Sequence, residues 1–183
     1  MDKVQFMIIK IVNPNNLSEE QVDRTVKRVK AVMLNDKQEV IICQNNGSFS
    51  FVGGHIEGDE TALQALKREV KEETGISIDK YDHKPVMQLK SFHQNYFDSG
   101  KSCLSIIYYY LIQTNKEIDL TNLNLDENEK LGNFGLFYIP LQELSDTLHA
   151  SESYENKKGL YDEMLVAADV CLDELAKGNQ YQF

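Results

Sequence analysis

Runs of apolar and β-branched residues recur along the chain between short polar turns, which predicts several strands. The run at residues 103–113 (CLSIIYYYLIQ) is apolar enough for a strand at the centre of a sheet. Residues 25–34 and 39–44 flank the polar turn Asn35-Asp36-Lys37, a pattern typical of a β-hairpin. Further strands are predicted at residues 4–12, 48–52, 86–92 and 134–139.

Two stretches have the periodicity of helices. In the first, Asp59 or Thr61 can cap the start, apolar residues follow at helical spacing, and Gly75 ends the last turn. The second, residues 156–177, is an amphipathic helix with Leu160, Met164, Ala167, Ala168, Cys171 and Leu175 along one face. Residues 115–133 are acid-rich without a clear period and are expected to form a loop. The pattern predicts a single α+β domain over residues 1–183.

Composition narrows the classes of function. The net charge of −10 argues against wide contact with a nucleic-acid duplex, which rewards basic surfaces. Cys43, Cys103 and Cys171 form no metal-binding or disulfide pattern, so we expect free cysteines and a reducing, cytoplasmic location. No signal peptide is apparent and no apolar stretch approaches about 18 residues, so no membrane association is expected.

The first helix carries a crowded group of carboxylates. Glu69, Glu72 and Glu73 stand at i, i+3 and i+4 and so share one helix face within a turn. Their repulsion is relieved by a hard divalent cation such as Mg²⁺ or Mn²⁺, which prefers oxygen ligands. A solvated acidic face is the alternative interpretation. A salt bridge between Glu60 and Arg68, two turns apart, would tie the helix start to its end and favours a built site.

The segment GHIEGDETALQALKREVKEETGI at residues 54–76 resembles the Nudix box of the Nudix hydrolases, the MutT-like superfamily. It fits the pattern GX5EX7REUXEEXGU, in which U is aliphatic, at every fixed position. The lead-in at residues 49–57 is also similar to that of the family, except that Val52 stands where many members have proline. The resemblance implies the Nudix fold, an α/β/α sandwich with a mixed β-sheet packed between helices and a C-terminal helix.

The resemblance also implies a pyrophosphohydrolase that uses Mg²⁺ or Mn²⁺. The ligands would be the carbonyl of Gly53 and the carboxylates of Glu69, Glu72 and Glu73. The metal would neutralise a pyrophosphate and lower the pKa of the attacking water. The expected substrate is a nucleoside diphosphate linked to another moiety, such as an NTP, a nucleotide sugar or ADP-ribose.

Further roles are carried over within the box. Arg68 would orient Glu69 and pair with Glu60, and Gly75 would end the helix. Gly54 and His55 are candidates for contact with phosphate. Glu69 is a candidate for the general base.

A later acidic loop is the other source of a base, with Glu127 or Glu129 as candidates. His93 is a candidate for lining the substrate pocket, with an ordinary polar loop as the alternative.

The sequence leaves the substrate open. The secondary signatures of ADP-ribose pyrophosphatases, NADH diphosphatases, diadenosine polyphosphate hydrolases, coenzyme A diphosphatases and isopentenyl diphosphate isomerases are absent. A catalytically inactive module that senses a nucleotide or ADP-ribose is the alternative function, although such modules usually have eroded box carboxylates. A homodimer through the helix at residues 156–177 would require its apolar face to be exposed.

Overall fold

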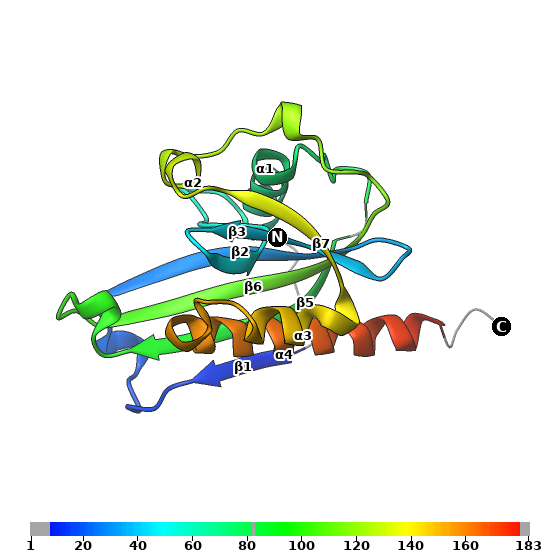
Figure 1. Cartoon of the computed structure of the whole chain (residues 1–183). Coiled ribbons are helices and arrows are strands. Elements are labelled where there is room, and N and C mark those ends of the chain that lie inside the picture. The colour runs from blue at the N-terminus through cyan, green and yellow to red at the C-terminus, as the bar shows by residue number, and fades with distance from the viewer. Residues whose placement is uncertain (1–7, 82, 180–183) are drawn as a thin grey trace.

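The computed structural model describes residues 8–81 and 83–179, and its centre is a seven-stranded mixed sheet (Figure 1). The strand order is β1-β5-β6-β2-β3-β4, and β7 pairs with β3 outside that path. The strands are β1 (Ile8–Val12), β2 (Arg24–Leu34), β3 (Glu39–Asn45), β4 (Ser48–Phe51), β5 (Lys84–His93), β6 (Cys103–Gln113) and β7 (Gly135–Pro140). The helices are α1 (Ala62–Thr74), α2 (Glu127–Leu131), α3 (Leu144–His149) and α4 (Tyr154–Asn179), with 3-10 turns at Glu19–Gln21, Tyr96–Asp98, Leu120–Asn122 and Leu141–Glu143.

Strand β6 lies in the interior of the sheet, as its apolar sequence predicts. It pairs antiparallel with β5 and parallel with β2 along its whole length. Because side chains alternate across a strand, Tyr109 and Tyr110 enter opposite layers, and they are 1% and 2% exposed. The sheet therefore has two buried faces, which explains why this strand is apolar without alternation.

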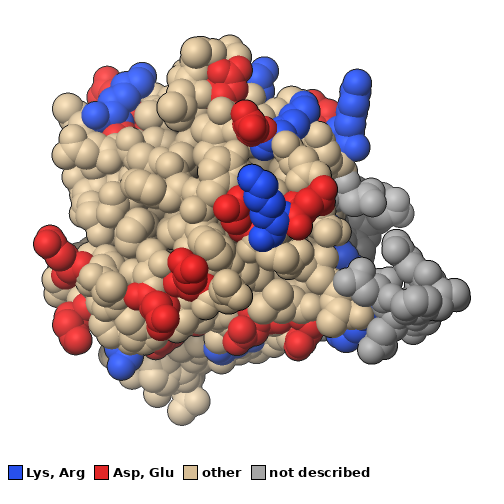
Figure 2. All heavy atoms as spheres, turned by 45° about the vertical axis from the view of Figure 1, so that its right-hand side comes forward, with Lys and Arg blue, Asp and Glu red and all other residues tan. Residues whose placement is uncertain are grey.

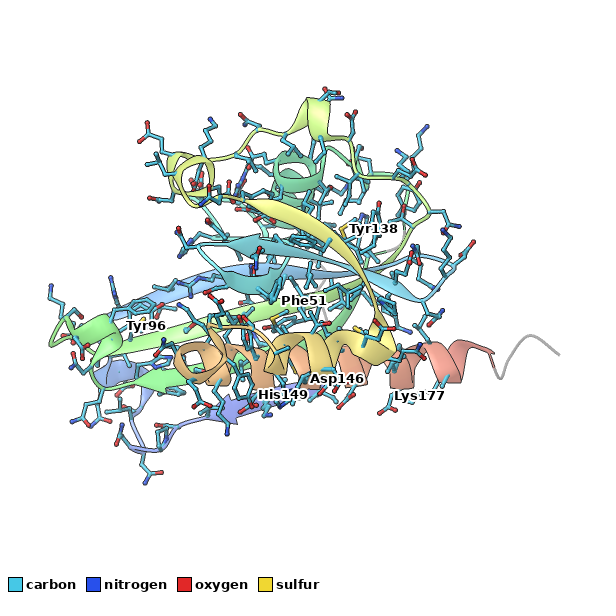
Figure 3. The ribbon with its side chains drawn as sticks, in the orientation of Figure 1. Phe51, Tyr96, Tyr138, Asp146, His149 and Lys177 are labelled. Atoms are coloured by element: carbon cyan, nitrogen blue, oxygen red, sulfur yellow. The ribbon has the colours of Figure 1, made fainter. Side chains whose placement is uncertain are left out.

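Helices cover both faces, which confirms the α/β/α arrangement expected from the sequence. Helix α1 packs on one face against Val29, Ala31 and Met33 of β2. On the opposite face, α3 and α4 cover Val32 and Tyr109. Phe51, labelled in Figure 3, lies in the same layer and meets Tyr109 edge to face with ring centroids 6.4 Å apart. The apolar face of α4 is thus used within the fold.

Three elements differ from the sequence-based expectation. Residues 115–133 are not a plain loop, because they contain the 3-10 turn Leu120–Asn122 and helix α2, which Asp126 caps. The expected hairpin is reduced to the one pair Leu34 with Val40, because β3 pairs instead with β4 and β7. Helix α4 begins at Tyr154 and continues through Gly178 to Asn179. The first part of the strand predicted at residues 4–12 lies outside the described residues.

The surface and the cysteines agree with the composition. Basic side chains on the face in Figure 2 are separated by acidic and uncharged ones, so this face offers no continuous basic surface. Cys43, Cys103 and Cys171 are free and buried. None of the helices that the structure describes combines the length and hydropathy needed to cross a bilayer.

Candidate active site

Helix α1 has well-defined ends. Thr61 caps its start by accepting a hydrogen bond from the Gln64 backbone N–H, and the Thr61 N–H donates one to Oε1 of Gln64. At the other end, Gly75 adopts φ 73° and donates its N–H to the Lys71 carbonyl at 2.9 Å. Ala65, Leu66 and Val70 are fully buried against the sheet, whereas Leu63 is 37% exposed. Because these three apolar side chains face the sheet, the orientation of the helix face that carries the glutamates is fixed.

The turn before the helix lies against β2 and needs two glycines. Gly53 has φ 125°, and a Cβ there would lie 2.3 Å from the Val29 carbonyl oxygen. A Cβ on Gly54 would lie 2.6 Å from Oε1 of Glu69. The turn is held by backbone hydrogen bonds from Ala31 N–H to Val52 O at 2.8 Å and from Val29 N–H to Gly54 O at 2.9 Å. The backbone at Val52 is therefore held by β2 without the ring of a proline.

Two of the expected carboxylates are buried beneath this turn. Oε2 of Glu73 accepts a hydrogen bond from the Gly53 N–H at 2.6 Å, and Glu73 is only 5% exposed. Burial raises the pKa of Glu73 to about 8, although Lys30 and the Gly53 hydrogen bond act in the opposite direction. Burial also raises the pKa of Glu69, which Arg68 partly offsets.

Arg68 links the acidic residues of the segment. Its Nε and Nη2 donate to the two oxygens of Glu60 at 2.8 and 3.0 Å, so the ion pair anticipated from the spacing is present. Its Nη1 donates to Glu69 at 2.8 Å and to Glu72 at 3.0 Å, and its Nη2 also reaches the His55 carbonyl at 2.9 Å. These bonds raise the pKa of Arg68 and lower that of Glu60. The guanidinium thereby fixes the positions of two carboxylates and the turn.

Lys30 of β2 also belongs to the site and was missed in the sequence. Its Nζ donates to the carbonyl of Phe51 at 2.8 Å and to that of Gly53. The charge of the same ammonium opposes the rise that burial causes in the pKa values of Glu69 and Glu73. The available signal was a lysine inside a strand whose next four residues, 31–34, are all apolar and buried.

A cavity of about 240 Å³ opens beside the carboxylates, and residues of both α1 and the later acidic segment line it. Asn124 donates its backbone N–H to the Glu72 carbonyl at 2.8 Å and its side-chain amide to Oε1 of Glu72 at 3.2 Å. Of the two loop candidates, Glu129 lines the cavity and Glu127 does not. The lining residues are Glu57, Arg68, Glu69, Glu72, Glu73, Asn124, Leu125, Asp126 and Glu129.

Gly54 and His55 lie at the edge of this arrangement and are not among the residues that line the cavity. The side chain of His55 is exposed, and partial desolvation, followed by the charge of Arg28, holds its pKa below the usual value. Its imidazole is therefore neutral at physiological pH, and the residue contributes its backbone carbonyl to Arg68.

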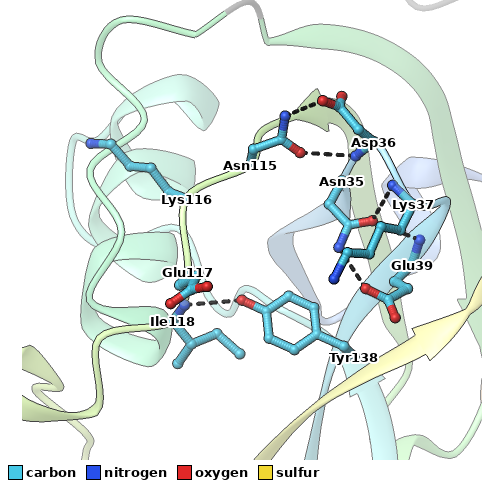
Figure 4. Close-up of a pocket in the computed structure, with 9 residues that line it drawn as sticks. All are labelled: Asn35, Asp36, Lys37, Glu39, Asn115, Lys116, Glu117, Ile118 and Tyr138. Atoms are coloured by element: carbon cyan, nitrogen blue, oxygen red, sulfur yellow. Dashed lines mark hydrogen bonds between the residues drawn. The ribbon is translucent and has the colours of Figure 1, made fainter.

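A larger hollow of about 640 Å³ lies elsewhere, between the β2–β3 turn and residues 115–118 (Figure 4). Several of its polar groups already bond to one another. Asn115 accepts a hydrogen bond from the Asp36 N–H at 2.9 Å, and the Tyr138 hydroxyl accepts one from the Ile118 N–H at 3.0 Å. Size alone therefore does not identify the functional site, and the smaller cavity holds the unusual carboxylates.

The donors around the small cavity are of the type that a hard cation prefers. Carboxylate oxygens of Glu69, Glu72 and Glu73 face one region, and the Lys30 ammonium on the Gly53 carbonyl shows that this oxygen accepts a cationic group. Within residues 8–81 and 83–179, no three His, Cys, Asp or Glu side chains are already grouped as a metal site. Arg68 and the Gly53 N–H engage these carboxylates instead, so the donor set fits a metal in chemistry but is not assembled around one.

Comparison with protein-family models supports the resemblance of residues 54–76 to the Nudix box. The family model described as the NUDIX domain matches residues 24–161. No curated protein matches the chain by sequence.

Several solved structures are similar to the chain. The Caenorhabditis elegans Ap4A hydrolase has 17% identity and a TM-score of 0.49, over 82% of this chain and 98% of that one. A MutT protein from Bacillus halodurans has 19% identity and a TM-score of 0.49, over 76% and 82%. A MutT described from Aliivibrio salmonicida and Vibrio cholerae has 17% identity and a TM-score of 0.47, over 77% and 96%. Because the family model spans most of the chain, including the box helix and the strands around it, the chain belongs to the NUDIX domain family and is an enzyme of the pyrophosphohydrolase class.

Proposed function

We propose that this pyrophosphohydrolase is metal dependent and cleaves the pyrophosphate linkage of a nucleoside diphosphate joined to another moiety. The observation that carries the proposal is the burial of Glu69 and Glu73 against the Gly53–Gly54 turn, with Glu72 beside them. Buried carboxylates that close together are costly unless a cationic partner is bound. An acidic cavity can receive the anionic substrate once that cation is present.

The Gly53 carbonyl and the carboxylates of Glu69, Glu72 and Glu73 would hold Mg²⁺ or Mn²⁺. When bound, such an ion supplies charge neutralisation and Lewis acidity at the pyrophosphate. Lys30 would leave the Gly53 carbonyl and offer its ammonium to a phosphate oxygen. Lys30 would thus donate to the Gly53 carbonyl when no metal is bound, and metal binding at that carbonyl would displace its ammonium.

Arg68 would act as a positioning residue, because its fork holds Glu69 and Glu72 in fixed orientations. In hydrolysis, water attacks one phosphorus, a carboxylate takes the water proton, and the bond to the bridging oxygen breaks as the second phosphate leaves. We assign the proton to Glu69, with Glu129 as the second candidate, because both side chains line the cavity. We retain Gly54 and His55 as candidate phosphate contacts at the edge of the site.

The test is turnover of a substrate panel with Mg²⁺ or Mn²⁺, measured as phosphate or pyrophosphate release. The panel holds canonical and oxidised NTPs, ADP-ribose, NADH, nucleotide sugars and dinucleoside polyphosphates. For Glu72→Gln we expect a loss of about ten- to a hundredfold in kcat/KM, as commonly follows removal of a metal-site group. An unchanged rate in this variant would overturn the metal assignment.

The loop offers a matched pair of variants for the base. Glu129→Gln should lower kcat, whereas Glu127→Gln, two residues earlier on the same short helix, should not. Equal effects of the two changes would show that Glu129 has no special role. Nucleotide binding without turnover of any panel member would favour the sensing module over the hydrolase.

A further inference from the structure

A second cavity, of about 380 Å³, lies on the other face of the sheet, between α4 and strands β1, β5 and β6. The apolar part of its wall comes from Val12, Met87, Leu89, Ile107 and Val166. Sites for small organic molecules typically measure about 300–1,000 Å³ and combine an apolar wall with a few polar groups. The cavity has the size and character of a site for a small organic group.

Glu163 brings a carboxyl group into this cavity from α4. The Tyr109 hydroxyl donates a hydrogen bond to its Oε1. Burial raises the pKa of Glu163 to about 7, against the attraction of Lys30, Arg28 and Lys10. None of the ion pairs found among the described residues includes Glu163. The carboxyl group is thus desolvated without a direct cationic partner.

The cavity adjoins the proposed pyrophosphate site through β2. In the parallel pairing of β2 with β6, Lys30 is the register partner of Tyr109, and its ammonium reaches the Gly53 carbonyl. Two positions earlier on the same face, Arg28 donates to Ser105, which lines the cavity, at 3.3 Å. Two cations therefore lie between the Gly53 turn and the cavity, where phosphates of a bound nucleotide would pass.

A structural role alone does not account for Glu163. An acceptor for the Tyr109 hydroxyl need not be ionisable, since an amide oxygen accepts equally well. A carboxylate has about four lone-pair sites on two oxygens, and Tyr109 uses one of them. Glu163 is half-buried, so its remaining acceptor sites are open to the cavity. A hydrogen-bond donor on a molecule in the cavity could reach them.

We propose that Glu163 is a specificity-determining residue that accepts a hydrogen bond from the amino group of a heterocyclic base, whose ring lies on the apolar wall of the cavity. The substrate would then be a nucleotide with an amino-bearing base, and its phosphates would extend past Arg28 and Lys30 to the Gly53 turn. This inference rests on the proposed function for the position of the phosphates, but not for the binding of the base.

The test uses nucleosides, which carry no phosphate and need no metal. Guanosine and inosine differ only in an amino group. Uridine has a carbonyl and a ring N–H where cytidine has an amino group and a ring acceptor. We expect the amino-bearing member of at least one pair to bind the wild-type protein about ten- to a hundredfold more tightly, as for a hydrogen bond to a charged group. The two pairs distinguish a purine from a pyrimidine site, and ligand-observed NMR titration measures the dissociation constants.

Glu163→Gln is the decisive variant, because its amide oxygen can still accept from Tyr109 and preserve the fold, whereas the NH2 group that replaces Oε2 donates and cannot accept from the base. The variant should bind both members of the preferred pair equally. Asp169→Asn, an exposed change on the same helix, is the control and should keep the wild-type preference. Circular dichroism checks that each variant is folded.

Failure of this inference is separable from failure of the proposed function. Equal binding within both pairs, no binding of any nucleoside, or a preference that survives in Glu163→Gln would each overturn it. A preference that disappears in Glu163→Gln, in a protein without turnover, would support the base site and count against the hydrolase. With turnover, Glu163→Gln should raise KM for the amino-bearing substrate and leave kcat unchanged.

Discussion

At the scale of single residues, the site is a balance between carboxylates that repel one another and a small number of cations. Arg68 serves Glu60, Glu69 and Glu72 at once, and Lys30 faces Glu73 from the neighbouring strand. The box pattern predicted which carboxylates come together, because helical spacing alone places them on one face. Lys30 could not be found in this way, since its contact with Gly53 depends on how the turn lies on β2.

Glu73 gives the pH prediction. Its folded pKa of about 8 lies above the ordinary value of 4.5, so the native protein binds the additional proton between these values. The associated stability is complete below about pH 4.5 and is lost as the pH rises toward 8. In chelator, Glu73→Gln should therefore gain stability relative to wild type with rising pH over this window. Urea unfolding at several pH values measures this, and parallel curves for the two proteins would contradict it.

At the scale of elements, the Gly53 turn provides a strong mutational test. Alanine at Gly53 meets the Val29 carbonyl oxygen at 2.3 Å and must adopt φ 125°. Gly47, with φ 73°, has open space around the added Cβ and is a matched control. We expect a loss of about 3–5 kcal/mol in the free energy of unfolding for Gly53→Ala, and about 1–2 for Gly47→Ala. Similar losses in denaturant unfolding would show that the turn is not in close contact with β2.

The elements also show where sequence patterns succeed. Strand β6 and helix α1 were predicted because strong apolar periodicity and good caps agree with their tertiary surroundings. The hairpin of residues 25–34 with 39–44 is confirmed only next to its turn, where Leu34 pairs with Val40, because a local turn signal cannot reveal that β4 and β7 will pair with the rest of β3. Helix α2 has only five residues and no buried one, so no apolar period was available to predict it.

At the scale of the whole molecule, α4 closes one layer of the core. Met164 is 1% exposed beneath it, whereas Leu172 on the same helix is 41% exposed. Met164→Ala should cost about 2–5 kcal/mol of unfolding free energy, and Leu172→Ala less than about 0.5. If urea unfolding gave equal losses, or if Leu172→Ala changed the light-scattering mass, the outer face of α4 would instead be an interface between copies of this chain.

The pairing of β2 with β6 has a consequence for how the chain folds. Asp23 and Ser102, which precede the two strands and bond to each other, are 79 positions apart along the chain. Closing so long a segment costs conformational entropy before the central pair stabilises it, and such non-local contacts slow folding. The Gly53 turn, helix α1 and β5 all lie inside that segment. The site is therefore completed only after β6, the second strand of the central pair, is in place. Activity should therefore return late in refolding, after most of the helical signal.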